Sequence, residues 1–193
     1  SPLPQITQSV VIDGYTQPDA RPNGEAGGND AVLQVQLDGS ALGFTGVGLV
    51  VATDGARVRG LAVNGFSIAG IRVRNGKGAR IDGNFIGTHS SGLTAIPNGV
   101  GVGIDDDAAD TVIGGGDPAA RNVISGNTGP GIAIRGASGT RIEGNFIGTD
   151  RTGGARVPNG DGIRMFSGKS TAIGGTGAGQ RNVISGNREY GIQ

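Results

Sequence analysis

The sequence predicts an all-β fold of the solenoid type, in which short strands stack from turn to turn as a parallel β-helix. Three observations predict it: the composition, a repeat about 60 residues long, and short stretches with alternating inward and outward residues. Of 193 residues, 34 are Ile or Val, only 8 are Leu or Met, and 41 are Gly. β-Branched side chains favour strands because their restricted χ1 suits a pleated surface. The composition therefore excludes an ordinary helical domain.

The repeat organises the whole chain. Three segments return unchanged after 60 or 61 residues, namely Arg121–Asn127 at 181–187, Gly83–Thr88 at 144–149 and Pro97–Gly99 at 158–160. Matches at one period indicate a repeat architecture, in which each unit packs only on its neighbours. The glycine-rich sequence has no Gly-X-Y period, which excludes a collagen helix.

The repeated unit divides into a coil of about 23 residues and a longer coil with some 15 extra residues. Extending this register towards the N-terminus places Tyr15 and Leu61 in one column, and their separation of 46 residues corresponds to two short coils. We therefore expect about seven coils, all in one domain that spans residues 1–193.

Within each coil, alternation with a period of two places one set of side chains inside and the other outside. Stacked copies of a strand then form columns of side chains about 4.8 Å apart. An aliphatic core column is expected from Val63, Ile86, Ile124, Ile147 and Ile184. An inward amide ladder, in which each side chain bonds to the next, is expected from Asn84, Asn122, Asn145 and Asn182.

An aromatic column lies beside the aliphatic one, with Phe85 and Phe146 in the same places as Val123 and Val183. Simple alternation makes these residues an outward apolar stripe. A reversal of the alternation at the asparagine bend makes them a second core column instead. The sequence leaves both interpretations open.

Each longer coil carries two insertions, Thr88–Asn98 and Gly114–Arg121, which return at 149–159 and 174–181. Extra residues in a solenoid form loops on one side, and loops commonly carry function. We expect two lateral ridges with a groove between them. The alternative is that these turns, rich in Gly, Pro and Asn, only cover a corner of the coil.

The rungs at residues 121–134 and 140–150, which read RNVISGN…GIAI and TRIEGNFIGTD, resemble those of the right-handed parallel β-helix repeat proteins. The resemblance extends from about Val10 to the end of the chain and implies a right-handed coil. The superfamily is pectate-lyase-like and includes pectate and alginate lyases, uronan epimerases, phage tailspikes and large bacterial surface proteins. The long repeats are most similar to the last group, which implies an extracellular or cell-surface location in a bacterium.

Lyases of this superfamily use a basic proton abstractor, often Arg or Lys, with calcium or another cation that neutralises the uronate carboxylate. The nearest approach to such a substrate-binding set consists of four outward residues, Arg80, Asp82, Arg141 and Glu143. A solvated sheet face with interleaved charges explains them as well. The sequence lacks the Asp-Pro-His of the epimerases and the Arg-x-Pro-x-x-Arg of pectate lyases, which argues against both activities. The only histidine, His89, is interpreted as a surface loop residue because Asp150 takes its place in the next repeat.

One cluster of carboxylates stands out, at Asp105, Asp106 and Asp107. Such a cluster suits Ca²⁺, which takes six to eight oxygen ligands, but the spaced pattern of an EF-hand loop is absent. The alternative is ion pairing with basic residues of the neighbouring rungs, namely Arg74, Lys77 and Arg135. We expect these ion pairs, and therefore no resident metal or cofactor.

The functional expectation rests on how regular the repeat is. An enzyme should break its repeat with unique polar residues in one groove, so the sequence predicts a non-catalytic structural or adhesive module. The alternative is a polysaccharide-active enzyme of the lyase or epimerase type, or a carbohydrate-binding β-helix. With 16 acidic and 16 basic side chains, no net charge attracts nucleic acid. No apolar run is long enough to span a membrane, and no Cys is present for disulfides.

Both ends of the sequence lack a segment that could cap the solenoid. The chain opens at Ser1-Pro2 and stops at Gln193 inside a coil, which leaves strand edges open. We expect either a piece of a longer protein or head-to-tail stacking of copies, a contact that does not close and so builds a filament.

Overall fold

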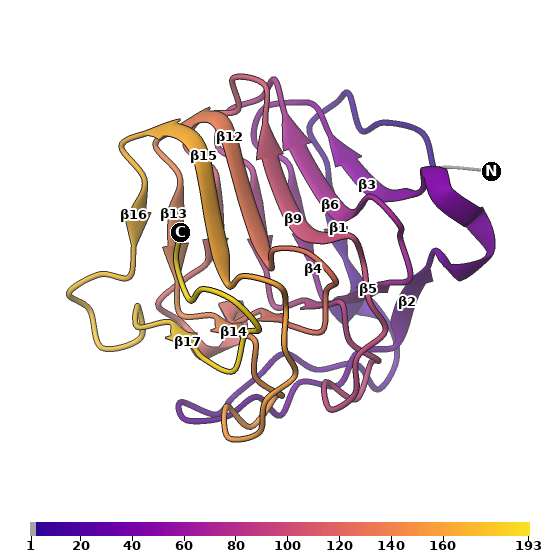
Figure 1. Ribbon diagram of the computed structural model, residues 1–193. Coiled ribbons are helices and arrows are strands. Elements are labelled where there is room, and N and C mark those ends of the chain that lie inside the picture. The colour runs from indigo at the N-terminus through magenta and orange to yellow at the C-terminus, as the bar shows by residue number, and fades with distance from the viewer. Residues whose placement is uncertain (1–2) are drawn as a thin grey trace.

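The computed structural model describes residues 3–193. It contains three sheets of parallel strands, and each sheet extends along the length of the molecule (Figure 1). The first sheet contains, in spatial order, β1 (Val11–Asp13), β4 (Arg57–Arg59), β7 (Arg80–Asp82), β10 (Val112–Gly114), β13 (Arg141–Glu143) and β16 (Ala172–Ile173). The second contains β2 (Val35–Asp38), β5 (Leu61–Asn64), β8 (Phe85–Ile86), β11 (Val123–Ile124), β14 (Phe146–Ile147) and β17 (Val183–Ile184). The third contains β3 (Val47–Val51), β6 (Ala69–Arg74), β9 (Val100–Asp105), β12 (Ile132–Ser138) and β15 (Ile163–Lys169).

Helical structure in the described residues is limited to three short 3-10 segments, η1 (Gly14–Thr16), η2 (Ser40–Thr45) and η3 (Pro118–Ala120). All strand pairs that stack within the three sheets are parallel, and successive passes of the chain add one strand to each sheet in turn. The arrangement is consistent with the predicted parallel β-helix. No helix within residues 3–193 is long and apolar enough to cross a membrane.

The predicted aliphatic column is confirmed by the strand register. Ile124 pairs with Ile86 on one side and with Ile147 on the other, and the column continues to Val63 and Ile184. The members from Val63 to Ile147 are fully buried in the main core between the three sheets. Parallel stacking therefore brings identical side chains together, which explains why the repeat preserves them.

The first turn of the solenoid differs from the prediction. Val11 pairs with Arg57 and Val35 pairs with Leu61, so β1 and β2 belong to the same pass of the chain. The 46 residues from Tyr15 to Leu61 therefore form one long coil rather than two short ones. The first and second sheets hold six strands each, and the third holds five, with single bridges from Ile6 and Ile192 at its two ends. Spacing alone misled here because one coil with a long insertion has the length of two plain coils.

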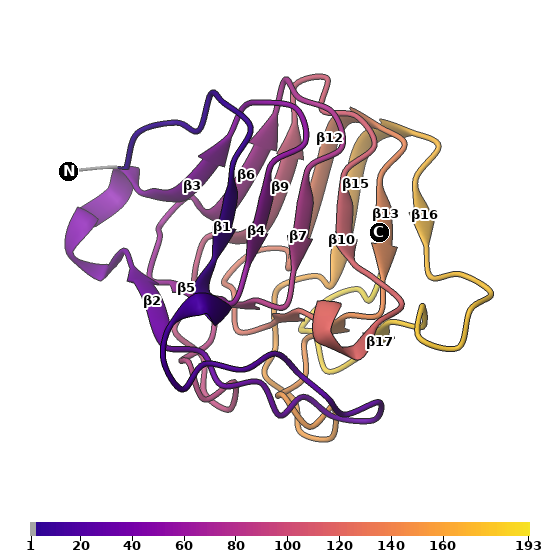
Figure 2. The ribbon, with the colours of Figure 1, turned by 180° about the vertical axis from the view of Figure 1, so that it is seen from behind.

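The extra length of this coil is a hairpin, residues 17–34, which we call the strap. Backbone hydrogen bonds in both directions between Arg21 and Val32 close it. Figure 2 shows the strap as an indigo segment that runs along the lower edge of the molecule towards β17. Just before it, the buried hydroxyl of Tyr15 donates to the carbonyl oxygen of Gly83 at 2.6 Å, and burial raises the pKa of Tyr15.

The predicted asparagine ladder is confirmed. Asn84 Nδ2 donates to Asn122 Oδ1 at 3.2 Å, Asn122 Nδ2 donates to Asn145 Oδ1 at 2.8 Å, and Asn145 Nδ2 donates to Asn182 Oδ1 at 3.1 Å. A second ladder, which the sequence interpretation missed, stands at the next bend and consists of Asn98, Asn127, Asn159 and Asn187. Each ladder satisfies buried amide groups at a bend where no strand can do so.

Candidate functional site

The outward face of the second sheet forms the floor between the two predicted ridges. Phe85, Val123 and Phe146 follow one another along it, with Ala62 before them and Val183 after them. Phe85 and Val123 belong to an apolar cluster that is separate from the main core. The aromatic column therefore faces away from the main core, and Phe85 and Val123 are buried in a second, smaller core.

Most of this stripe is covered by the strap. Ala31 and Leu33 of the strap pack in the same apolar cluster as Phe85 and Val123, and all four side chains are buried. The space in which a substrate-binding groove was expected is thus filled, over the early coils, by the protein's own chain. Burial of this apolar surface stabilises the docked strap.

The ridge formed by Thr88–Asn98 and residues 149–159 is a stack of two similar loops. The N–H of Arg151 in the second loop donates to the carbonyl oxygen of Gly92 in the first at 2.9 Å. Asp150 organises its loop by accepting hydrogen bonds from Thr152, Gly154 and Ala155. Burial acts to raise the pKa of Asp150, but these hydrogen bonds outweigh it and hold that pKa below its usual value.

His89 has the position of Asp150 in the preceding loop, and it also accepts a hydrogen bond from the backbone N–H two residues further along the chain. Its Nδ1 lies 3.1 Å from the backbone N–H of Ser91, which donates to it. The ring is exposed. The prediction of a surface loop residue is confirmed.

The other ridge, Gly114–Arg121 and residues 174–181, also stacks turn on turn. Gly179 lies so close to the carbonyl oxygen of Gly116 that a Cβ at residue 179 has no room. The Asp117 side chain accepts a hydrogen bond from the N–H of Ala119 and begins η3. These turns contact one another at Gly116 and Gly179, and a pocket lined by Arg121 and Arg181 opens beside them.

Two arginines hold the strap between the ridges. Arg121, from the second ridge, donates to the carbonyl oxygens of Glu25, Ala26 and Gly28 in the strap and of Gly144 in the next rung. Its guanidinium also lies 4.6 Å from the ring centroid of Phe146, a cation–π geometry.

Arg151, from the opposite ridge, donates to the carbonyl oxygens of Asn29 and Ala31. Its guanidinium lies 5.7 Å from the ring centroid of Phe85. The strap is therefore clamped from both sides by guanidinium groups that also cover the aromatic floor.

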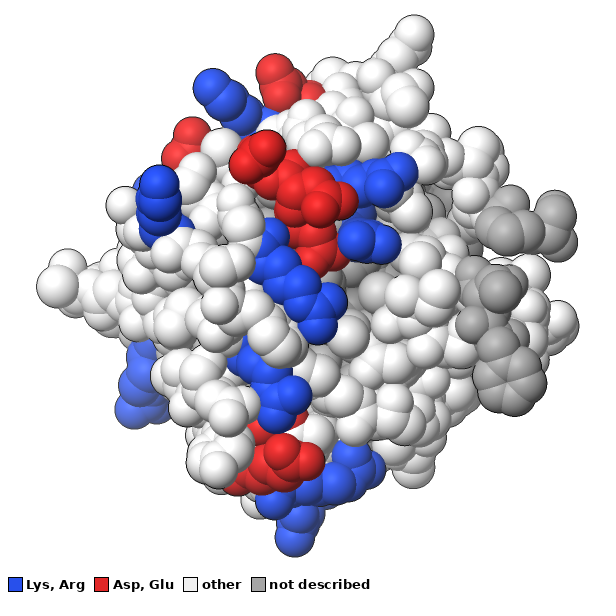
Figure 3. Space-filling model, turned by 45° about the horizontal axis from the view of Figure 1, so that its top comes forward, with Lys and Arg blue, Asp and Glu red and all other residues white. Residues whose placement is uncertain are grey.

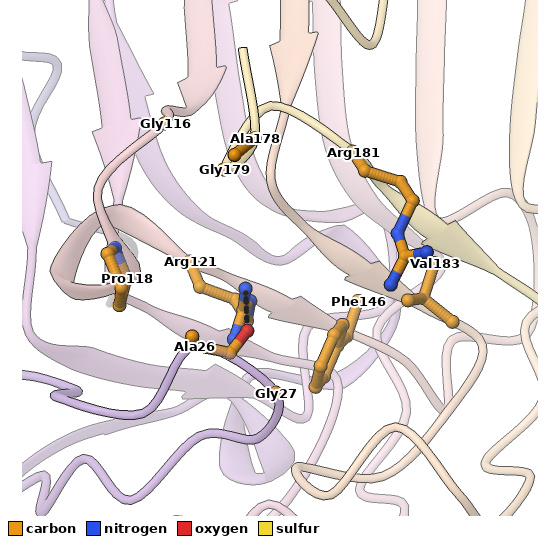
Figure 4. Close-up of a pocket in the computed structure, with 10 residues that line it drawn as sticks. All are labelled: Ala26, Gly27, Gly116, Pro118, Arg121, Phe146, Ala178, Gly179, Arg181 and Val183. Carbon is orange, nitrogen blue, oxygen red and sulfur yellow. Dashed lines mark hydrogen bonds between the residues drawn. The ribbon is translucent and has the colours of Figure 1, made fainter.

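Beyond the strap tip, a pocket of about 300 Å³ remains open (Figure 4). The tip residues Ala26 and Gly27 bound it on one side and the second ridge bounds it on the other, with Phe146 and Val183 at the floor. Arg121 and Arg181 both line it. Burial lowers the pKa of Arg121, and the positive charge of Arg181 lowers that pKa further.

The four residues predicted as a substrate-binding set lie on the first sheet, and none of them lines this pocket. Asp82 is buried and accepts two hydrogen bonds from Arg57, at 2.8 and 2.6 Å from its Nε and Nη2. Arg80 is exposed, stacked on Arg57 and separated from Arg141 by Val112.

Glu143, the fourth member of the set, is engaged by its neighbours. Its carboxylate lies 3.8 Å from Arg141 Nε and accepts a hydrogen bond from Gln180 at 3.1 Å. The four residues therefore sit in one band of a sheet, and their carboxylates are occupied by inter-rung or neighbouring contacts.

The acidic cluster forms ion pairs, but with a different base from those predicted. Arg72 Nε lies 2.7 Å from Asp105, and Arg72 Nη2 lies 3.9 Å from Asp106. Asp107 is exposed. Arg74, Lys77 and Arg135 make no ion pair with the cluster in the described part of the chain. Asp105 is the last residue of β9, and its carboxylate lies beside Gly103, which pairs with Arg72, rather than beside Arg74, its own register partner.

Figure 3 shows acidic and basic side chains close together in a band on this face of the molecule. Within residues 3–193, no group of three or more His, Cys, Asp or Glu side chains has a geometry that could hold a metal ion. Two of the three carboxylates at this corner, those of Asp105 and Asp106, face Arg72.

No protein family, curated protein or solved structure matches the chain. The pocket residues were absent from the set expected from the sequence. Arg121 and Arg181 open the two copies of the repeated RNVISGN run, so the repeat itself contained the signal. The strap gave no such signal because it has no copy elsewhere in the chain.

Proposed function

We propose that the protein is a non-catalytic structural or adhesive module of a bacterial extracellular or cell-surface protein, built as a right-handed parallel β-helix. The observation that carries the proposal is the use of its polar groups. Carboxylates such as Asp82 and Asp105 bind arginines of neighbouring rungs, the asparagines bind one another, and the chain's own strap fills the space between the ridges. An enzyme needs such groups free to face a substrate.

Head-to-tail stacking of copies is part of this proposal. The last strands of the first and second sheets, β16 and β17, lie at a sheet edge. Beside them, residues 191–193 pair with the first part of β15, and Met165 and Phe166 of that strand are 41% and 50% exposed. At the opposite edge Val11 is 62% exposed, although Ile6 covers part of β3 by pairing with Val51. Open parallel edges with apolar residues favour the addition of another chain.

The direct test is incubation with pectin, alginate and other uronans, followed by ultraviolet detection of unsaturated products. We expect none from any of them, and cleavage of one would overturn the non-catalytic assignment. Arg80, which is exposed and lacks an ion-pair partner in the described residues, is the residue on which the lyase or epimerase alternative depends. If cleavage occurred, its disappearance in the Arg80→Gln variant would support the lyase or epimerase alternative.

A second measurement addresses stacking and binding. Sedimentation velocity over a range of concentrations is expected to show growth of larger species, while a monomer at high concentration would remove stacking from the proposal. Retention on immobilised polysaccharide without cleavage would instead favour the carbohydrate-binding alternative.

A further inference from the structure

We propose that the pocket at the strap tip binds a small organic carboxylate. The anionic group faces the guanidinium groups of Arg181 and Arg121, and the apolar body of the ligand lies against Phe146 and Val183. Figure 4 shows these side chains around one open space, with Arg181 reaching down beside Val183 and Arg121 held against the strap. This inference goes beyond the structural role proposed above and stands without it.

The first argument is charge. Two guanidinium groups line the pocket, and in the described part of the chain neither lies within ion-pair distance of an acidic side chain. Arg181 disfavours the charged form of Arg121, so the two cations repel each other. A carboxylate between them removes this repulsion and gains from both charges.

The second argument is the number of free hydrogen-bond donors. A guanidinium has five N–H donors, and Arg121 uses four of them on the carbonyl oxygens of Gly144, Glu25, Gly28 and Ala26. These bonds fix its plane and leave one N–H. Arg181 is exposed and keeps its planar fork, which matches the two oxygens of a carboxylate.

The third argument is the comparison of these two arginines, which open identical sequence runs 60 residues apart. Arg121 binds oxygens that the strap supplies from its backbone. Arg181 has the same local sequence and stands past the strap tip, where residues 3–193 supply no such oxygen to its guanidinium. The guanidinium of Arg181 is therefore available to donate hydrogen bonds to the oxygen atoms of a ligand.

The fourth argument fixes the size and character of the ligand. The pocket volume of about 300 Å³ is at the lower end of the range for small-molecule sites. Apart from the two arginines its lining is apolar or glycine, with Ala26, Pro118, Phe146, Ala178 and Val183. A compact acid with a flat apolar body satisfies both the charge and the lining, whereas an inorganic anion satisfies only the charge.

The experiment uses three probes at constant ionic strength: benzoate, benzyl alcohol as its neutral analogue, and inorganic phosphate. Two-dimensional NMR follows the amides of Gly27 and Gly179 and the methyl groups of Val183 during each titration. We expect saturable shifts of these signals with benzoate. Benzyl alcohol and phosphate are each expected to bind at least about tenfold more weakly.

Arg181→Gln and Arg156→Gln form a matched pair of variants, because both residues are exposed arginines at the end of a repeated loop and Arg156 lies outside the pocket. Arg181→Gln should weaken benzoate about tenfold or more with an unchanged melting temperature, and Arg156→Gln should leave benzoate binding within about twofold. Equal binding of benzoate and benzyl alcohol, equal binding of benzoate and phosphate, absence of shifts at the pocket, or equal losses in the two variants would each overturn the proposal.

Discussion

Arginine is used in two different ways on two sides of this solenoid. On the first and third sheets, Arg57 and Arg72 bind the carboxylates of Asp82 and Asp105. Along the second sheet, Arg121 and Arg151 bind backbone carbonyl oxygens of the strap. The two sides carry the same residue type, and the partner that the chain offers decides what it does.

The difference concerns which parts of the chain are joined. Arg57 and Asp82 are 25 residues apart, so their ion pair links neighbouring rungs that the strands already hold together. Arg121 and Glu25 are 96 residues apart, and their hydrogen bond joins the first coil to the fourth. A contact between neighbouring rungs adds little cohesion to a stack that is already paired, whereas one across several rungs ties the stack lengthwise.

The largest effect is expected from Arg121→Gln. The change leaves up to four carbonyl oxygens without their donor and uncovers the ring of Phe146, which should cost about 3 kcal/mol of the free energy of unfolding. Arg57→Gln is the matched change on the other side and should cost less, about 2 kcal/mol, because Arg59 lies 3.8 Å from the buried Asp82 and keeps a positive charge beside it. Chemical denaturation measures both, and equal losses would remove the distinction between the two sides.

A smaller loss is expected from Arg151→Gln, about 1.5 kcal/mol, because two strap carbonyl oxygens lose their donor while Arg121 still holds the tip. The strap should then be cut faster by a protease of broad specificity, with the first cleavage between residues 17 and 34. A digestion rate identical to that of the parent protein would show that Arg151 does not hold the strap.

A pH-dependent effect on the free energy of unfolding is expected at Asp150, whose pKa lies below its ordinary value in the folded protein. Stability from this carboxylate is complete above the unfolded pKa of about 4 and is lost as the pH falls through the lower, folded pKa. The difference in unfolding free energy between the parent and Asp150→Asn should therefore be largest near neutral pH and shrink in acid. A difference that grew in acid would contradict the assignment of the loop hydrogen bonds to the ionised form.

No effect is expected from metal removal. The carboxylates of Asp105 and Asp106 face Arg72, so a chelator should leave the melting temperature unchanged. A fall in melting temperature with EDTA that calcium reverses would mean that this corner holds a metal ion.

The sequence predicted those parts of the fold that repeat. The core column around Ile124 and the ladder around Asn122 follow from identical residues at a constant spacing, since parallel stacking converts sequence period into spatial contact. The second ladder, around Asn127, was predictable by the same argument because its residues sit in the repeated Asn-Gly and Gly-Asn motifs.

The parts that do not repeat could not be predicted in this way. The strap has no copy, and the coil that contains it happens to be as long as two plain coils, so the period concealed it. The partner of Asp105 also escaped prediction, because its carboxylate reaches along β9 to Arg72 rather than to Arg74, its register partner. The pocket depends on where the strap ends and on which arginine the strap leaves uncovered, so it could not be predicted either.

The most direct test of the central claim, that the protein's own strap closes the space between the ridges, is native-state hydrogen exchange of the strap amides. The N–H of Ala31 donates to Asn29 Oδ1 at 3.1 Å, and that of Val32 donates to the carbonyl oxygen of Arg21 at 2.9 Å. A docked strap predicts that both exchange at least about a hundredfold more slowly than in an unfolded chain, and that Arg121→Gln and Arg151→Gln together remove this protection. Exchange of both amides at unfolded-chain rates in the parent protein would contradict the account.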